Sequence, residues 1–345
     1  MLPTSPFRSR SAARPFTRRA LLSAAAATAV LVTATACGGT AQSGTAAAGE
    51  GIKKLSIVVP ANTGGGWDQT GRALADAVKA GSLAGSSQVE NVPGAGGTNG
   101  LAKLATEKDP NTLMVMGYVM VGSVETNGSK NRLEDTTPIA RLTEEPLVLV
   151  VPKDSPYQSV DDLVADIAAK GKDVAVTGGS AGGADHILMG QILKAAGIPS
   201  SQLNYIGYSG GGESLAALLG NKVQAGISGV GEYAEQVKAG TVRALAVSGS
   251  KPSPALPEVT TLTDQGIDVV LTNWRGVVAP GSIDADQKAA LVELVGKVHE
   301  SAEWKETLAA KNWDDAYLSG DEFDSYLAEE IEAVKATLSE IGLVK

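Results

Sequence analysis

LSIVVPANTGGGWD, at residues 55–68, decides the fold because it joins three kinds of segment in one short stretch. Leu55–Val59 is a β-rich run, residues 60–66 form a turn of small residues, and a helix is predicted from Asp68. Gly-rich turns between a strand and a helix are common in α/β folds. Ligands of open α/β sheets bind beyond the carboxyl ends of the strands. The stretch therefore predicts an α/β fold and marks this turn as a candidate binding loop.

The same alternation continues along the chain. Further strands are predicted at Gln88–Asn91, Leu113–Met116, Leu147–Val151, Asp173–Thr177, Leu203–Tyr205, Ala225–Ser228, Ala244–Val247 and Gly276–Ala279. Helices are predicted at about 68–80, 98–107, 160–169, 184–196, 212–220, 231–239, 284–300 and 320–341. Strand–helix alternation predicts mainly parallel sheets. The last helix should begin with a capping box at residues 319–322 and bury one apolar face. That face consists of Phe323, Tyr326, Leu327, Ile331, Val334 and Leu338.

Four strand-to-helix loops consist almost wholly of small residues and contain neither Lys nor Arg. They lie at residues 60–68, 91–100, 177–183 and 208–212, two in each half of the chain. Glycines can adopt positive φ and let a ligand approach the backbone amides. A helix N-terminus adds unpaired N–H groups and partial positive charge, so these loops predict an anion site without a cationic side chain. We accordingly expect Gly65→Val and Gly96→Val to weaken binding more than Arg72→Ala or Arg275→Ala.

The first 36 residues predict an export signal. Residues 1–19 contain five arginines and no acidic residue, and residues 20–36 are uncharged and rich in Ala, Leu and Val. This order is typical of a secretory signal peptide, and the apolar stretch is short for a membrane span. Residues 17–22, TRRALL, resemble a twin-arginine signal. An ordinary basic segment explains them equally, so the export route stays open.

Cys37 is the only cysteine and directly follows the apolar stretch. Ala34-Thr35-Ala36-Cys37 resembles a lipobox, with Ala34 where the pattern prefers Leu. We expect Cys37 to carry a lipid anchor and residues 37–52, rich in small residues, to be a flexible tether with a reach of about 20 Å. A lone cysteine excludes an intramolecular disulfide and a Cys-based metal cluster. With two histidines in the whole chain, no metal or other cofactor is expected.

The charge balance argues against nucleic acid or an anionic membrane surface as a partner. Five of the 29 Lys and Arg residues lie before residue 37, and none of the 38 Asp and Glu residues do. The exported chain therefore has 24 basic and 38 acidic residues, a formal charge of −14. Its 309 residues are enough for two domains.

An ordered series of motifs resembles a known family from about residue 53 to the C-terminus. The motifs are VPANTGGGWDQT (59–70), ENVPGAGG (90–97), PIARL (138–142), GGSAGGADH (178–186), YIGYSGGGE (205–213), LAVS (245–248), PALPEVTTL (254–262) and WRG (274–276). They are similar to those of the substrate-binding components of tripartite tricarboxylate transporters, the TctC/Bug type. The resemblance implies a solute-binding protein outside the cytoplasmic membrane that passes a small carboxylate to integral-membrane permease subunits. It implies a monomer without enzymatic activity.

The resemblance also implies a two-lobed periplasmic-binding-protein fold of type II-like form, with two crossing strands as its hinge. Lobe one would contain residues 53–148 and 274–345, and lobe two residues 149–273. In this family the first two loops hold one carboxylate through amides and hydroxyls, and the loops of lobe two hold the distal end. The candidate ligand-binding residues are Asn62, Thr63, Gly64, Gly65, Gly66, Trp67, Asp68, Gly94, Ala95, Gly96, Gly97, Asn99, Ser180, Gly182, Gly183, His186, Tyr208, Ser209, Gly210, Gly211, Ser228 and Glu232.

Several of these side chains have structural interpretations that the sequence leaves open. Asp68 is as well explained as a helix N-cap, and Trp67 as a core residue beside its loop. His186 is compatible with packing on its helix, and Glu232 with a solvated helix start.

The alternative function is a serine hydrolase. Gly178-Gly179-Ser180-Ala181-Gly182 matches the G-x-S-x-G nucleophile turn between a strand and a helix. Such a site needs a histidine base. His186 lies on the same unit as Ser180, and His299 is predicted to flank a packed helix, so neither is placed as a base.

Overall fold

The computed structural model describes residues 51–344, which lie in one compact unit. The predicted export signal, Cys37 and nearly all of the tether lie outside the described residues.

The strands are β1 (Leu55–Val59), β2 (Ser87–Asn91), β3 (Thr112–Gly117), β4 (Thr137–Pro152), β5 (Ala175–Gly178), β6 (Asn204–Gly207), β7 (Ala225–Gly229), β8 (Val242–Val247), β9 (Thr272–Ala279) and β10 (Asp314–Ser319). The helices are α1 (Gly66–Ala80), α2 (Thr98–Leu104), α3 (Tyr118–Thr126), α4 (Val160–Lys170), α5 (Ala184–Ala195), α6 (Gly211–Leu219), α7 (Val230–Lys238), α8 (Ala285–Glu300), α9 (Ala302–Lys311) and α10 (Asp321–Glu340).

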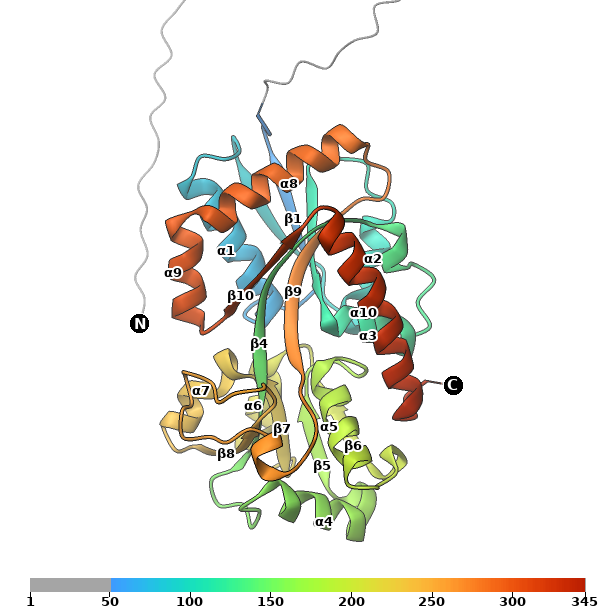
Figure 1. The fold of residues 1–345 in the computed structure, drawn as a ribbon, viewed down its shortest axis with the longest axis vertical. Helices are drawn as coiled ribbons and strands as arrows, with labels where there is room; N and C mark the ends of the chain where they lie inside the picture. The colour runs from blue at the N-terminus through green and yellow to red at the C-terminus, as the bar shows by residue number, and fades with distance from the viewer. Residues whose placement is uncertain (1–50, 345) are drawn as a thin grey trace, which may run out of the picture. The chain divides into compact units, whose positions relative to one another are not determined.

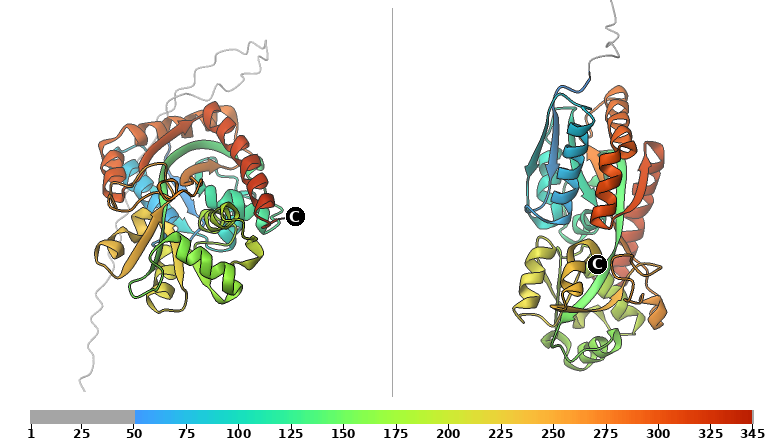
Figure 2. Two further views of the ribbon diagram at one scale, coloured as in Figure 1. Left: turned by 60° about the horizontal axis from the view of Figure 1, so that its bottom comes forward. Right: turned by 90° about the vertical axis from the view of Figure 1, so that its left-hand side faces the viewer.

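The strands form two groups that share β4, whose 16 residues are far more than the five predicted (Figure 1). The first half of β4 lies between β9 and β10, and β9 leads on to β3, β1 and β2. The second half of β4 lies between β7 and β8, and β7 leads on to β5 and β6. Figure 2 follows β4, in green, from one group into the other.

Parallel and antiparallel pairing occupy different places in the sheet. β1 pairs in parallel with β2 and β3, and β5 pairs in parallel with β6 and β7. All pairings of β4 and β9 are antiparallel. The parallel strands therefore place their carboxyl ends, with the Gly-rich loops, around the middle of β4, where its partners change.

Three elements were missed by the sequence prediction: α3, α9 and β10. α3 directly follows β3, and the residues of the two make one almost uninterrupted apolar run, TLMVMGYVMVGSV. Both elements are almost wholly buried, so neither shows the period of an exposed face. β10 begins with two acidic residues, Asp314 and Asp315, which are uncommon in strands.

The predicted capping box of the last helix is wrong. Ser319 is the last residue of β10, and Gly320 precedes the helix with φ of +58° and no side-chain cap. The positive φ suits the sharp change from strand to helix, which glycine adopts without a Cβ penalty. The apolar face of α10 is confirmed, with Phe323, Leu327, Ile331, Val334 and Leu338 buried and Tyr326 half-buried.

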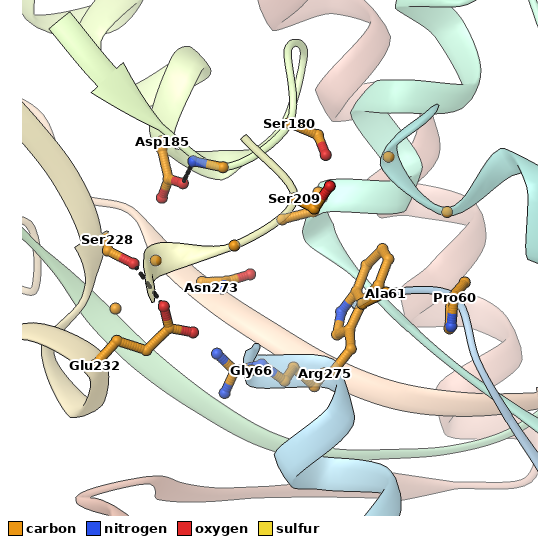
Figure 3. Close-up of a pocket in the computed structure, with 18 of the residues that line it drawn as sticks. Pro60, Ala61, Gly66, Ser180, Asp185, Ser209, Ser228, Glu232, Asn273 and Arg275 are labelled. Atoms are coloured by element: carbon orange, nitrogen blue, oxygen red, sulfur yellow. Dashed lines mark hydrogen bonds between the residues drawn. The ribbon is translucent and has the colours of Figure 1, made fainter. Parts of the chain in front are cut away.

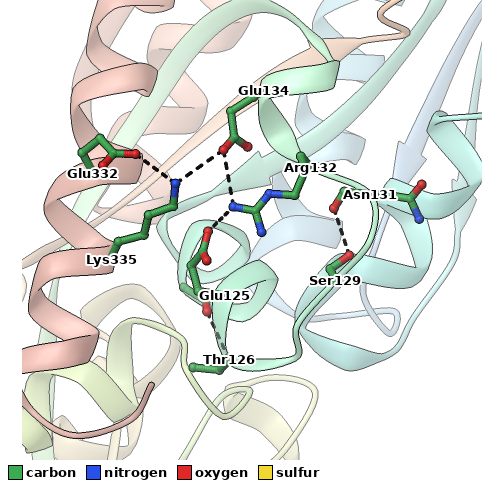
Figure 4. Close-up of polar contacts among 9 residues, drawn as sticks. Glu125, Thr126, Ser129, Asn131, Arg132, Glu134, Glu332 and Lys335 are labelled. Carbon is green, nitrogen blue, oxygen red and sulfur yellow. Dashed lines mark hydrogen bonds and ion pairs between the residues drawn. The ribbon is translucent and has the colours of Figure 1, made fainter. Parts of the chain in front are cut away.

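α10 is held to the first group of strands by core packing and by a network of charges. Arg132 pairs with Glu125 at the end of α3 and with Glu134, and Lys335 on α10 pairs with Glu134 at 3.6 Å (Figure 4). Because these side chains are partly exposed, we expect each pair to contribute little and the buried face to provide most of the stability.

None of the helices between residues 51 and 344 combines the length and the apolar character needed to cross a bilayer.

Candidate functional site

All four Gly-rich loops meet at one pocket where β4 passes between the two strand groups. The cavity has a volume of about 80 Å³. Its lining residues come from the ends of β1, β2, β5, β6 and β7, from the first turns of several helices, and from β9 (Figure 3). They are Pro60, Ala61, Gly66, Trp67, Gly94, Ala95, Gly96, Gly97, Val119, Gly179, Ser180, Asp185, Ser209, Gly210, Gly211, Ser228, Gly229, Glu232, Asn273 and Arg275.

The loop after β2 forms the wall on the side of the first strand group. Gly94, Gly96 and Gly97 all have positive φ, at +120°, +61° and +94°. A Cβ on Gly96 would lie 2.0 Å from the Ser123 hydroxyl, and one on Gly97 would lie within 3 Å of the Trp67 ring. Both the backbone conformation and the space therefore require glycine here. Trp67 is 8 % exposed and lines the pocket, so it is at once a wall residue and a core residue.

Gly65 differs from this pattern. Its φ is −73°, and a Cβ there would meet nothing closer than 3.7 Å. Positive φ in this loop falls on Gly64 instead, so the backbone conformation of Gly65 does not require glycine.

The two strand groups touch each other around the pocket. The Asn62 amide in the first loop donates to the Glu213 carboxylate in the first turn of α6 at 3.1 Å. On the other side, the Ser123 hydroxyl on α3 donates to the carbonyl of Ala181 in the third loop at 3.4 Å. Residues far apart in sequence thus connect the two strand groups near the pocket.

A buried ion pair lies against the pocket. Arg275 on β9 pairs with Glu145 on β4, and the two side chains are 3 % and 0 % exposed. The second oxygen of Glu145 accepts from the backbone amide of Gly231 at 3.0 Å, at the start of α7. The Arg275 guanidinium also lies over the Trp313 ring at 5.2 Å. These contacts hold the Arg275 side chain near the point where β4 stops pairing with β9 and β10 and begins to pair with β7 and β8.

Two polar atoms of β9 lack a partner within the described part of the chain. Nη1 of Arg275 and Oδ1 of Asn273 are both buried and form no hydrogen bond. Residues two apart on a strand face the same side, and both residues line the pocket. An unpaired buried donor is costly unless a bound group satisfies it. Arg275 Nη1 is therefore suited to donate to a ligand oxygen.

The pocket also contains two carboxyl groups from the second strand group. Glu232 on α7 accepts from the Ser228 hydroxyl at 2.9 Å, and Asp185 on α5 accepts from the backbone amide of Gly179 at 2.5 Å (Figure 3). Burial raises the pKa of Asp185 to about 7, against the lowering effect of the Gly179 amide. Burial, and then the charge of Glu145, also raise the pKa of Glu232. Both groups are therefore weaker acids than exposed carboxyl groups.

The structure divides the predicted ligand-binding set into two parts. Those that line the pocket are Gly66, Trp67, Gly94, Ala95, Gly96, Gly97, Ser180, Ser209, Gly210, Gly211, Ser228 and Glu232. Those outside its lining are Asn62, Thr63, Gly64, Gly65, Asp68, Asn99, Gly182, Gly183, His186 and Tyr208. Tyr208 lines an adjoining open depression together with Ala95, Gly96, Asn127, Ser180, Ala181, Gly207, Ser209 and Glu213.

Asp68 and His186 have structural partners. Asp68 is the third residue of α1, not its N-cap, and its carboxylate accepts from the Gly64 amide at 2.8 Å and from Arg72 and Asn91. Burial acts to raise the pKa of Asp68, but these hydrogen bonds outweigh it and lower the pKa. The His186 ring stacks on Tyr205. Its Nδ1 accepts from the Gly182 amide at 3.1 Å, and burial lowers its pKa to about 4.

Sequence reasoning missed the pocket residues that lie outside the Gly-rich turns. Pro60, Ala61 and Gly179 belong to the loops already identified, but Val119, Asp185, Gly229, Asn273 and Arg275 were not assigned to the site. Asp185 could have been found from its place in the first turn after the third loop. No signal in the sequence pointed to Asn273 and Arg275, because the predicted strand began only at Gly276 and their burial is visible only in the structure. Arg275 lines the pocket, so we no longer expect it to matter less than the glycines.

The side chains required for a serine hydrolase are not assembled. Ser180 lines the pocket, but the described residues of its lining include no histidine. His299 lies on α8, and its ring stacks on Tyr317 of β10. Its Nε2 is hydrogen-bonded to a carboxylate oxygen of Asp315, also on β10, at 2.9 Å. Between residues 51 and 344, no group of three His, Cys, Asp or Glu side chains is arranged to hold a metal ion.

Comparison with known proteins agrees with the fold. Residues 71–343 match the tripartite tricarboxylate transporter family receptor, TctC. A Cupriavidus necator protein encoded in the gbd 5' region is 30 % identical over 300 residues, which is 85 % of this chain and 89 % of that protein.

Two solved structures have a similar fold. The periplasmic binding protein BugD has a TM-score of 0.75 at 22 % identity, covering 85 % of this chain and 99 % of BugD. MatC from Rhodopseudomonas palustris, with bound malate, has a TM-score of 0.70 at 21 % identity over the same shares. The predicted α/β periplasmic-binding-protein fold is confirmed by these likenesses.

The family resemblance read from the motifs is likewise confirmed by the match over most of the chain. The hydrolase alternative has no support from the family or from the pocket. The chain belongs to the TctC/Bug family of tripartite tricarboxylate transporter receptors, which are extracytoplasmic solute-binding proteins and not enzymes.

Proposed function

We propose that this receptor captures a small di- or tricarboxylate in the pocket beside Arg275 and delivers it to the integral-membrane permease subunits of its transporter. The observation that carries the proposal is the convergence of four Gly-rich, helix-opening loops on one pocket that is also lined by Arg275, a buried residue with one unpaired guanidinium nitrogen. Loop amides and helix N-termini stabilise an anion, and a guanidinium donates to a carboxylate with defined geometry. The bound malate of MatC, a protein of similar fold, supports a carboxylate ligand.

A thermal-shift screen tests the ligand class. The mature chain, with Cys37→Ser to prevent lipidation, is heated with malate, citrate, adipate and their neutral amides. A carboxylate at 100 times its dissociation constant should add about 2.7 kcal/mol to the free energy of unfolding. Stabilisation by the amides as strong as that by the acids would contradict an anion site.

Ligand capture in this proposal involves relative movement of two lobes, formed by residues 53–148 with 274–345 and by residues 149–273. β4 and β9 would connect the lobes, and the Asn62–Glu213 hydrogen bond would break when the pocket opens. Small-angle scattering checks this movement. The radius of gyration should fall when the carboxylate binds, and an unchanged radius would indicate rigid binding.

We further propose that the receptor is exported and held at the outer face of the cytoplasmic membrane by a lipid on Cys37. The support is the signal-like segment, the lipobox-like residues 34–37 and the small-residue stretch that follows. Cys37→Ser should leave export intact and release the protein from the membrane fraction. A variant that still pellets with membranes in high salt would disprove the anchor.

A further inference from the structure

The carboxyl group of Asp185 faces the pocket but has no cation of its own. Of the described residues that line the pocket, only Arg275 is basic, and Arg275 is already paired with Glu145. Asp185 is 7 % exposed, so it is almost completely removed from water. The hydrogen bond it accepts comes from an uncharged donor, the Gly179 amide.

Two acidic groups and one basic group surround Asp185, so the acidic groups are in excess. Glu145 from β4 and Glu232 from α7 act on it as negative charges, and Arg275 from β9 is the opposing positive charge. Tyr205 from β6 and Tyr233 from α7 also face it, and burial raises the pKa of both, so they stay neutral. Its chain neighbour His186, whose pKa burial lowers, is neutral as well.

Glu232 is better compensated than Asp185. The Glu232 carboxyl group lies near the Arg275 guanidinium, because both groups border Gly66. A Cβ on Gly66 would lie 2.6 Å from Arg275 Nη2 and 3.0 Å from Glu232 Oε1. Glu232 also accepts from the Ser228 hydroxyl. Of the two pocket carboxyl groups, Asp185 is therefore the one for which negative charge is least favourable.

We propose that Asp185 holds a proton whenever the pocket contains its anionic ligand, so that the receptor captures a carboxylate together with one proton. This inference rests on the proposed function. A second negative charge beside an ionised Asp185 would be strongly opposed, because Asp185 is buried and the described lining of the pocket holds a single cation. The neutral carboxyl instead offers an O–H donor to a ligand oxygen, while Gly179 continues to donate to its other oxygen.

Burial raises the pKa of Asp185 to about 7, which puts the proton uptake in a measurable range. Below pH 6 the free protein already carries the proton, so binding takes up none. Above pH 7 the free protein has lost it, and each binding event must recover one proton from solvent. Affinity should then fall about tenfold per pH unit, by the linkage of proton binding to ligand binding. Above pH 7 malate, adipate and citrate are almost fully ionised and contribute little to the uptake. Below pH 7 the proton exchange of the ligand itself is subtracted, using the known ionisation constants of that ligand.

Titration calorimetry with malate, or with citrate or adipate if malate does not bind, measures the proton count. Heats are compared from pH 5.5 to 8.5 in pairs of buffers that titrate near the working pH and differ in ionisation enthalpy, MES and Bis-Tris in the acidic half of the range and HEPES and Tris in the basic half. The protein is the whole mature chain with Cys37→Ser. The expected uptake rises from near zero at pH 5.5 to nearly one at pH 8.5. Binding with no uptake at pH 8.5 overturns the inference alone. Failure of every carboxylate to bind at any pH overturns the proposed function and the inference with it.

Asp185→Asn identifies the residue, because asparagine resembles the protonated acid in shape and charge. We expect Asp185→Asn at pH 8.5 to bind malate as tightly as the parent at pH 5.5, with no proton uptake. Asp161→Asn, at an exposed position in the first turn of α4, is the matched control and should keep the parent's pH dependence. Proton uptake that persists in Asp185→Asn would contradict a proton on Asp185. Aspartate, which has an ammonium group where malate has a hydroxyl, gives a second check. If aspartate binds more tightly than malate and without proton uptake, Asp185 is ionised in the complex and the inference is wrong.

Discussion

Arg275 and Glu145 form an ion pair between neighbouring strands, although 130 positions separate them in the sequence. Both side chains are buried, at 3 % and 0 % exposure, and one guanidinium nitrogen remains unpaired beside the pocket. A buried pair contributes little net stability, but removal of one partner leaves an uncompensated charge. Loss of either charge should therefore destabilise the packing of β4 against β9 and also change the charge of the binding site.

The first prediction concerns Arg275→Met. The substitution should lower the free energy of unfolding by about 3–5 kcal/mol because Glu145 loses its counter-charge. It should also weaken carboxylate binding by removing the unpaired donor. Urea unfolding and calorimetric titration measure the two effects separately.

The double variant Arg275→Met/Glu145→Gln is the control for this prediction. It removes both charges, so stability should recover substantially while binding stays weak. Recovery of binding together with stability would mean that the arginine only supports the fold, and that the loop amides suffice for the anion.

The second prediction compares two glycines of the pocket loops. Gly96→Ala should lower both stability and affinity, by about 1–3 kcal/mol, because its φ is +61° and the new Cβ would collide with Ser123. Gly65→Ala should change stability by less than about 1 kcal/mol, since its φ is −73° and the space is open. Thermal melts and malate titrations of the two variants check this. Equal losses in both would indicate that loop flexibility, not backbone geometry, controls binding.

Local sequence signals were enough to predict the strands and helices that carry the four loops. Each Gly-rich turn joins its own strand to its own helix, so its position depends on neighbouring residues. The apolar stripe of α10 was readable for the same reason. The turn before α10 was not, because Ser319 has a capping preference in isolation but is the last residue of β10, which pairs with Ala140 on β4.

The charged part of the site could not be predicted in this way. Glu145 lies opposite Asn273 in the register of β4 and β9, and that register depends on folding of the whole chain. An arginine in a short segment such as Trp274-Arg275-Gly276 shows no sign of being buried. Asp185 has the appearance of an ordinary acidic residue in the first turn of a helix, and only its burial among other carboxyl groups gives it an unusual pKa.

The third prediction concerns the end of α10. Ile341 is 3 % exposed and packs on Gly190 of α5, where a Cβ would lie 2.8 Å from its side chain. Ile341→Ala should cost about 2–4 kcal/mol through loss of buried surface and the resulting cavity. The nearby Lys194–Glu340 pair is exposed, at 53 % and 60 %, so Lys194→Ala should cost at most about 1 kcal/mol. Urea unfolding of both variants tests the ranking, and the reverse order would show that charge, not packing, fixes the end of α10.

The fourth prediction follows from the raised pKa of Asp185, about 7 in the folded protein against an ordinary value of 3.8. Between these values the folded protein holds a proton that the unfolded chain has released. The contribution of Asp185 to stability is therefore fully present below pH 3.8 and is lost as the pH rises to 7. The total loss is on the order of 4 kcal/mol. Asp185→Asn cannot ionise, so its stability relative to the parent should increase from pH 4 to pH 7 and then stay level. Chemical unfolding of both proteins without ligand, at pH 4.5, 6 and 8, measures this difference. A difference that is the same at all three pH values would show that Asp185 titrates normally in the folded protein.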